Sequence, residues 1–349
     1  MRWPSREFKL FDIPVAHPSA FFLAFARTPI FNDRMNSLPL ARASASAVNR
    51  RDFICRTGLA AAGSVLFLGR EEGVAAQAGQ PQETSVGSNI YGWTQYAARD
   101  KKPLNLGEVI AALADTGYDY LENFMNLDQP DQNARFADQL RAKGLRPVSL
   151  YTGARLHEPE KSDEVIARVL AAAKVSQKAG FHVLSCNPDP IGRAKTEEEL
   201  KHQAAALDKL GAGLKDLGMR LGIHHHLPEM ANDAREFHYN FRHTPAGRVG
   251  FCYDVHWVWK GGIQPLDALR EYGHRVVTWH LRQSRDGVWW EDLDTGDVDY
   301  AAVAAYARQH RLPRRFTVEL ALEPGTKITR SAVENHRRSR EFVRRVFEA

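Results

Sequence analysis

The feature that most constrains this fold is a repeated pattern in which a short apolar run ends at an ionisable side chain. Such runs recur at roughly thirty-residue intervals, about the length of one strand–helix–strand unit. If each run is a strand of a parallel arrangement, the residues at the carboxyl ends of the strands meet at one end of the fold. The runs 221–223, 249–253, 276–279 and 316–318 are followed or ended by His224, Asp254, His280 and Glu319, respectively.

The whole of residues 79–349 follows the same alternation of strand and helix patterns. Strands are expected at residues 88–94, 118–124, 146–152, 181–186, 220–226, 249–256, 275–281 and 315–320. Helices are expected at residues 106–116, 134–143, 162–179, 196–217, 263–272, 298–309 and 329–347. A glycine closes several of these helices, as at Gly117 and Gly144, which is typical of a helix end. This alternation predicts parallel strands joined by right-handed crossovers.

Two architectures satisfy an alternation of this kind, a closed barrel and a doubly wound open sheet. An open sheet would spread the four strand-end residues along one edge, whereas a barrel brings them to one point. We therefore predict an α/β fold of the (β/α)8 TIM barrel type for residues 79–349, as a single domain.

The first 78 residues are interpreted as an N-terminal extension and a signal peptide. Residues 49–54 contain an Arg-Arg pair in the pattern of a twin-arginine signal, and the apolar stretch 57–69 follows. Residues 76–78 then offer a small-x-small cleavage site. The alternative is a chance arginine pair before an alanine-rich helix. The prediction is a periplasmic protein that is exported by the twin-arginine machinery.

Charge and cysteine content narrow the function classes. The formal net charge is +5, and the basic residues are scattered apart from a run at 336–345 that we interpret as a solvated helix face. Nothing in this distribution indicates a nucleic-acid partner. Cys186 and Cys252 are the cysteines of residues 79–349, too few for a disulfide framework.

The four strand-end residues have the chemistry of a divalent-metal site. Imidazole and carboxylate groups together suit Mn, Co, Zn, Fe or Ni, and a buried group of both is costly without a cation. A single such residue is more often a hydrogen-bonded structural group, but four on successive strands favour a site. The predicted metal ligands are His224, Asp254, His280 and Glu319. The cofactor is therefore expected to be one divalent metal ion.

Strand alternation selects further residues that face the same point. His226 shares a face with His224 while His225 takes the other face, and His256 shares a face with Asp254. Arg282 shares the face of His280 and is a candidate to hold a substrate oxygen. Aromatic faces stack on sugar rings, although packing between helices and barrel is the alternative for each of them. The predicted substrate-binding residues are His226, Trp257, Arg282 and Trp93.

Several motifs resemble a known family. The sequences IHHH at 223–226, YDVHW at 253–257, WHLRQS at 279–284, GDVDY at 296–300 and TVEL at 317–320 carry the resemblance. The chain resembles the xylose isomerase-like barrels, in the branch of sugar phosphate isomerases and epimerases, from Asn89 onward. The resemblance implies that Asp254, His280 and Glu319 are metal ligands.

The chain departs from the ketose epimerases of this family at the fifth strand. Those enzymes carry a glutamate at the position of His224, where it works with a second metal-bound glutamate on the other face of an enediolate. The histidine-rich segment here is similar to that of inosose dehydratases. The resemblance therefore implies proton abstraction next to a carbonyl, with Glu319 as the base and Glu229 or His256 as the second proton carrier.

Four function classes follow from these observations. The leading prediction is a metal-dependent isomerase or epimerase that acts on a keto sugar or related polyol through an enediolate. The alternative is a lyase or dehydratase of the same fold that acts on a keto sugar or a 3-keto-glycoside. A metal-dependent hydrolase and a sugar-binding protein without catalysis remain as weaker hypotheses. The expected partner is a small sugar, and a homodimer is a possible assembly.

Overall fold

The computed structural model describes residues 84–348. The predicted extension and twin-arginine signal at residues 1–78 lie outside this range, so the export signal and the periplasmic location stay predictions. Among residues 84–348, no helix is both long enough and apolar enough to cross a lipid bilayer.

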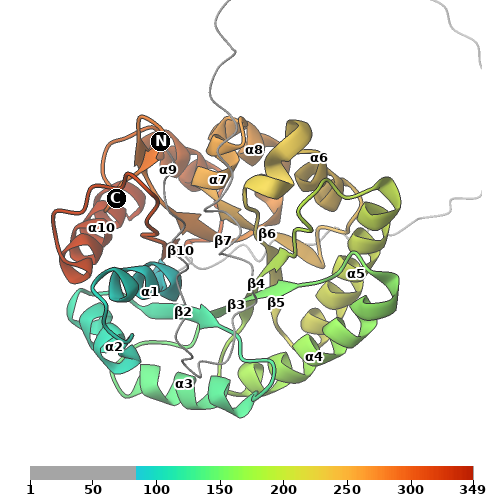
Figure 1. Ribbon diagram of the computed structural model, residues 1–349, viewed down its shortest axis with the longest axis horizontal. Coiled ribbons are helices and arrows are strands. Elements are labelled where there is room, and N and C mark those ends of the chain that lie inside the picture. Colours follow the sequence, from blue (N-terminus) through green and yellow to red (C-terminus); the bar gives the residue numbers. More distant parts are fainter. Residues whose placement is uncertain (1–83, 349) are drawn as a thin grey trace, which may run out of the picture. The chain divides into compact units, whose positions relative to one another are not determined.

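Eight parallel strands close into a barrel, and helices surround it (Figure 1). Going round the barrel, the strand order is β1, β10, β7, β6, β5, β4, β3 and β2. The strands are β1 Ser85–Asn89, β2 Tyr120–Phe124, β3 Ser149–Ala154, β4 Val183–Pro188, β5 Arg220–Ile223, β6 Val249–Asp254, β7 Val276–Leu281 and β10 Arg315–Val318. Parallel pairing of β1 with both β10 and β2 closes the ring. The predicted TIM barrel is confirmed, and the open sheet is excluded.

The helices follow the strands in the order that the sequence predicts, with additions. The helices are α1 Ile90–Arg99, α2 Leu106–Asp115, α3 Asp131–Arg141, α4 Pro159–Lys178, α5 Glu197–Asp216, α6 Leu227–Arg242, α7 Val255–Lys260, α8 Pro265–Tyr272, α9 Tyr300–Gln309 and α10 Ala332–Phe347. A 3-10 turn spans Gly273–Arg275, and the short strands β8 Ser284–Arg285 and β9 Val288–Trp289 form an antiparallel hairpin. The predicted helices correspond to α2, α3, α4, α5, α8, α9 and α10.

Four strands, β1, β5, β6 and β10, end earlier than predicted, and at two of these ends a polar residue caps a new helix. Strand one was expected at 88–94, but the Asn89 side chain accepts a hydrogen bond from the Tyr91 backbone and caps α1. Asp254 caps α7 in the same way, through the Trp257 backbone. Such caps contribute about 1 kcal/mol to helix stability. The fifth strand stops at Ile223, and its three histidines lie in the loop that follows.

Two further differences concern helices near the site. No helix was predicted at residues 227–242 or 255–260, where α6 and α7 lie. In α6 the residues 231–234 depart from helical geometry, so its apolar spacing is interrupted.

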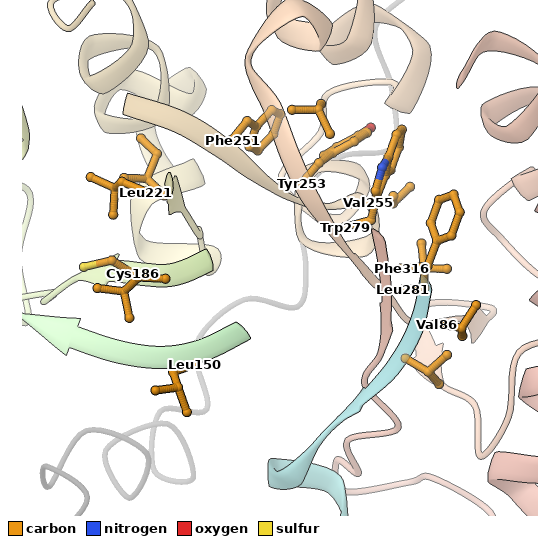
Figure 2. Close-up of a cluster of buried hydrophobic side chains, with 14 of the residues drawn as sticks. Val86, Leu150, Cys186, Leu221, Phe251, Tyr253, Val255, Trp279, Leu281 and Phe316 are labelled. Atoms are coloured by element: carbon orange, nitrogen blue, oxygen red, sulfur yellow. The ribbon is translucent and has the colours of Figure 1, made fainter. Parts of the chain in front are cut away.

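The two faces of the barrel strands differ in polarity. The outward face is apolar and packs against the helices, as Figure 2 illustrates with Leu221, Phe251 and Trp279. The inward face carries hydrogen-bonded polar groups, such as the Tyr120 hydroxyl, which lies 2.8 Å from Thr317 Oγ1. Gly87 makes room for that ring, because a Cβ there would come within 2.1 Å of it. The polar interior supports the residues at the carboxyl ends of the strands.

Candidate functional site

The structure brings together the four predicted ligands, His224, Asp254, His280 and Glu319. One ligand atom from each lies within 4.8 Å of the others, and all four side chains are buried. Asp254 pairs with His280 in the register of β6 and β7, and Glu319 directly follows β10. Barrel closure therefore places all four side chains at one end of neighbouring strands, as expected for this architecture.

Buried polar atoms of this cluster lack hydrogen-bond partners among residues 84–348, and this fits a bound cation. His224 Nε2 and Asp254 Oδ2 are 3.3 Å apart, and neither atom has a hydrogen-bond partner among residues 84–348. Leaving a buried imidazole and carboxylate in this state is costly unless another group completes the contacts. A donor set of two imidazoles and two carboxylates suits a divalent transition metal. The four residues are therefore a possible metal-binding cluster.

The His280 ring is held from both sides by carboxylates. Its Nδ1 lies 2.9 Å from Glu319 Oε2, in hydrogen-bond geometry. Its Nε2 lies 2.8 Å from Glu122 Oε1, but the oxygen is out of line with the N–H direction, so this contact is electrostatic and not a well-formed hydrogen bond. Carboxylates that contact the second nitrogen of a ligating histidine fix the orientation of its ring. Glu122 is therefore part of the site.

Glu122 was not among the predicted site residues. Its carboxylate, on β2, is fully buried and accepts hydrogen bonds from Asn89 Nδ2 at 2.9 Å, Ser149 Oγ at 2.8 Å and Ser185 Oγ at 3.0 Å. Burial alone would raise the pKa of Glu122, but His280 and these donors outweigh burial and lower the pKa. The signal for it was present in the sequence, because Glu122 also lies near the end of an apolar strand.

Arg282 lies directly beside the cluster, as predicted for a substrate-binding residue. Its Nη2 is 2.8 Å from Glu319 Oε1 and 4.0 Å from Asp254 Oδ2. The guanidinium stacks over Trp289 and Trp257, at 4.1 and 5.4 Å from the ring centroids, while Nη1 has no hydrogen-bond partner in the described part of the chain. This stacking holds a positive charge beside the cluster and leaves one donor for another oxygen.

The neighbours of Glu319 determine its protonation. Burial would raise the pKa of Glu319, but the Arg282 guanidinium and the His280 imidazole outweigh it and hold the pKa well below its ordinary value. Glu319 is therefore a carboxylate at neutral pH, with Oε1 engaged by Arg282 and Oε2 by His280. It can accept a proton readily only when one of these contacts is exchanged.

His226 and Glu229 lie next to the cluster on the β5 side. The His226 ring centroid is 4.6 Å from that of His224 and 5.7 Å from Trp257. Burial, followed by the charge of His224, lowers the pKa of His226 well below its usual value. Glu229 is fully buried and accepts a hydrogen bond from the His226 backbone at 2.7 Å. Burial and the charge of Glu236 raise the pKa of Glu229 to about 8.

His256 belongs to a different set of contacts. It lies in α7, and its ring neighbours include Trp257 and Trp259, with centroids at 6.1 and 5.4 Å. Its Nε2 is 3.0 Å from Ser284 Oγ, which donates its own proton to Asp297. Nε2 must therefore carry the proton in this contact, and burial together with Arg282 lowers the pKa of His256 to about 3. These contacts give no direct support for His256 as a proton carrier.

Two expectations about side-chain placement have clear outcomes. Trp93 does not face the cluster: it stacks on His336 of α10 at 4.1 Å and donates to Ser88 Oγ, because α1 begins at Ile90 and turns it into the helix layer. His225 points away from the site and packs against Phe237, as strand alternation predicts.

Tyr151 is a second residue that sequence reasoning missed. It lies on β3, and its ring centroid is 5.4 Å from that of His224 and 6.3 Å from that of His280. The side chain is 8% exposed, and its hydroxyl has no hydrogen-bond partner among residues 84–348. A tyrosine within an apolar strand pattern gives no signal that separates it from a core residue.

Comparison with known proteins now assigns the family. Residues 110–346 match the model of the xylose isomerase-like TIM barrel family. The chain belongs to this family. Its members and structural neighbours include isomerases, epimerases and dehydratases, so the chain is a member of an enzyme family.

The relatives diverge in reaction. Inosose dehydratase from Clostridium tetani is 32% identical over 93 residues, which cover 27% of this chain and 31% of that protein. The match thus spans about a third of the relative's length. A sugar phosphate isomerase/epimerase from Parabacteroides distasonis has a TM-score of 0.62 at 19% identity, covering 77% of this chain and 95% of that one. L-ribulose 3-epimerase has a TM-score of 0.61 at 15% identity, covering 76% and 95%. These structural matches support the shared fold.

Proposed function

We propose that this protein is a divalent-metal-dependent enzyme that removes the proton next to the carbonyl of a keto sugar or related polyol. The observation that carries the proposal is the buried cluster of His224, Asp254, His280 and Glu319 with Arg282 beside it. A divalent ion bound there would supply Lewis-acid stabilisation to negative charge on the substrate oxygens. The product is an epimer or isomer when the proton returns to carbon.

Arg282 and Glu319 have linked roles in this proposal. When a substrate oxygen takes the Nη2 contact of Arg282, Oε1 of Glu319 loses its ion pair and becomes a better base. Glu319 then accepts the proton from the carbon next to the carbonyl, while Arg282 stabilises the enediolate oxygen. The same exchange explains why a carboxylate with a low pKa in the resting site is still suited to be the base.

Glu229 is the preferred second proton carrier. Its pKa of about 8 keeps it protonated at neutral pH, so it can donate to an oxygen or a carbon of the substrate. The Glu229 carboxyl accepts a hydrogen bond from the His226 backbone, and its Oε1 lies 3.5 Å from Asn187 Nδ2. These contacts place it beside the loop that carries His224. His226 and Trp257 complete the substrate pocket, with His256 as the alternative proton carrier.

A lyase or dehydratase is the second candidate. The family resemblance places His224 where the ketose epimerases carry a second glutamate, and inosose dehydratases are among the sequence relatives. In that reaction Glu319 removes the same proton, and a hydroxyl or glycosidic oxygen on the next carbon leaves with the proton that Glu229 donates. Both candidates share the first step and differ in the fate of the intermediate.

The deciding experiment incubates the manganese-loaded full-length protein with inosose and with D-allulose in D2O. Proton NMR then follows exchange of the hydrogen next to the carbonyl, epimer formation and loss of water. Exchange with a new epimer supports the first candidate, and an unsaturated product supports the second. Absence of exchange in these and other keto sugars would overturn the proposed proton abstraction.

A further inference from the structure

Tyr151 places a phenol at the candidate metal-binding cluster from the opposite half of the barrel. It is an inward residue of β3, and its ring meets the His224 ring edge-on at an interplanar angle of 78°. The Phe124 ring also packs edge-on against it, with the ring centroids 5.9 Å apart, so contacts with two rings restrict the orientation of the phenol. The hydroxyl is therefore held near the site by rigid neighbours.

The hydroxyl of Tyr151 differs from the other buried phenols of the barrel strands. Tyr120 shares a hydrogen bond with Thr317, and Tyr253 donates to the Pro265 carbonyl at 2.8 Å. Tyr151 Oη has no partner in residues 84–348, although the side chain is more than nine-tenths buried. Burying a hydroxyl without a partner costs free energy, and such groups in a native structure call for a specific explanation.

The surroundings of the phenol indicate which kind of partner is missing. A phenol has an ordinary pKa of about 10, so the Tyr151 hydroxyl carries its proton at neutral pH and can donate a hydrogen bond. Among residues 84–348, Arg282 Nη1 is a second donor without a hydrogen-bond partner, beside the same cluster. Two such donors at one cluster favour an acceptor oxygen as the missing partner.

We propose that Tyr151 is a catalytic residue whose hydroxyl donates a hydrogen bond to the substrate oxygen that gains negative charge when the proton next to the carbonyl is removed. This inference rests on the proposed function and adds a neutral donor on β3 to the charged donor Arg282 on the other half of the barrel. The ligand that it serves is a keto sugar in its enediolate form. A donor that is aligned in advance costs no reorganisation during the reaction.

Replacing Tyr151 by Phe tests the proposal, because it removes one oxygen and keeps the ring contacts with His224 and Phe124. We expect kcat on the keto sugar that the wild type converts to fall roughly a hundredfold, the loss typical of one such donor, with KM little changed. The variant should keep its bound metal and unfold at the same or a higher temperature, since a buried hydroxyl without a partner is gone. Tyr253→Phe is the matched control: it loses a satisfied hydrogen bond, so it should unfold at a lower temperature and keep its kcat.

A second measurement does not depend on the identity of the substrate. Glycolohydroxamate, a small mimic of an enediolate, is titrated calorimetrically into the manganese-loaded wild type and Tyr151→Phe. We expect binding to weaken about tenfold or more in the variant, the effect of one hydrogen bond to a charged group. Wild-type kcat and mimic affinity in the variant would overturn the role of Tyr151 and leave the proposed function standing. A variant that loses activity together with thermal stability or metal would also overturn it, in favour of a structural role. If the wild type neither binds the mimic nor exchanges a keto-sugar proton, the proposed function itself fails and the inference with it.

Discussion

The two halves of the barrel contribute to the site in different ways. The strands β5, β6, β7 and β10 end at the four residues of the possible metal-binding cluster, and Arg282 follows β7. The strands β1, β2, β3 and β4 supply Glu122 with its three hydrogen-bond donors, and the hydroxyl of Tyr151. One half presents ligands. The other half orients a ligand and contains a hydroxyl donor that has no hydrogen-bond partner in the described part of the chain. A site of this kind therefore depends on residues that are not among its four candidate ligands.

The largest expected effect comes from removing a ligand from the half of the barrel formed by β5, β6, β7 and β10. In His280→Ala, the cluster loses one nitrogen and the contact that orients Glu319, so we expect bound metal to fall to background. Activity on the keto sugar should drop about a thousandfold or more, since Lewis-acid stabilisation is worth several kcal/mol. Elemental analysis beside the assay checks both. If His280→Ala retained one equivalent of metal, His280 would not be a metal ligand.

Glu319→Gln distinguishes the proposed role of Glu319 as a base from its role as a candidate metal ligand. The substitution keeps the size of the side chain but removes its capacity to accept a proton, so we expect kcat to fall a hundred- to ten-thousandfold. The steady-state assay is compared with Glu271→Gln, which alters a partly exposed carboxylate on α8 that pairs with Arg242. The control should behave as the wild type. Turnover of Glu319→Gln within a few fold of the wild type would rule out Glu319 as the base.

Glu122→Gln tests the supporting half directly. We expect metal affinity to fall about 10–100-fold, as for other partners of ligating histidines, while the fold persists. Competitive metal titration measures the affinity. Glu291→Gln is the matched control, because Glu291 is equally buried but holds Thr329 and Asn335. It should reduce stability and leave metal affinity unchanged. Equal metal affinities for Glu122→Gln and the wild type would contradict the orienting role of β2.

The pH dependence of stability tests Glu229. Its pKa is raised from 4.5 to about 8 in the folded state, so the folded protein binds the proton more tightly than the unfolded chain. The stability associated with this group is full below about pH 4.5 and is lost as the pH rises to about 8. Thermal unfolding of the wild type and Glu229→Gln between pH 5 and 9 should therefore diverge, with the wild type becoming relatively less stable toward high pH. Parallel curves would show that Glu229 is not held protonated.

The smallest effect on activity is expected in the helix layer. Trp93→Phe removes the hydrogen bond to Ser88 and reduces the stacking on His336, so we expect a loss of about 1 kcal/mol in stability. The value of kcat/KM should stay within about twofold, because this residue acts on packing alone. Chemical denaturation measures the free energy of unfolding, and the steady-state assay measures kcat/KM. A large loss of activity at unchanged stability would indicate that Trp93 contacts the substrate.

Much of this site was predictable from strand-end chemistry, for a physical reason. In a parallel barrel every carboxyl end lies on one side, so His224, Asp254, His280 and Glu319 could be grouped from sequence alone. The alternation of side chains also predicted the opposite directions of His224 and His225. Trp93 was misplaced because one cap at Asn89 converts a β-rich run into a helix, which changes the period from two to 3.6 residues.

The sequence by itself determined the alternation of strands and helices, the polar strand ends and the face on which each ligand lies, because these depend on local periodicity. Only the tertiary structure decided that Glu122 contacts His280, since β2 and β7 are not hydrogen-bonded neighbours and their side chains meet across the barrel interior. It also decided that, among residues 84–348, the Tyr151 hydroxyl lacks a hydrogen-bond partner while that of Tyr120 has one. Pairing across a closed barrel depends on distances between residues far apart in the chain, and local periodicity does not encode those distances.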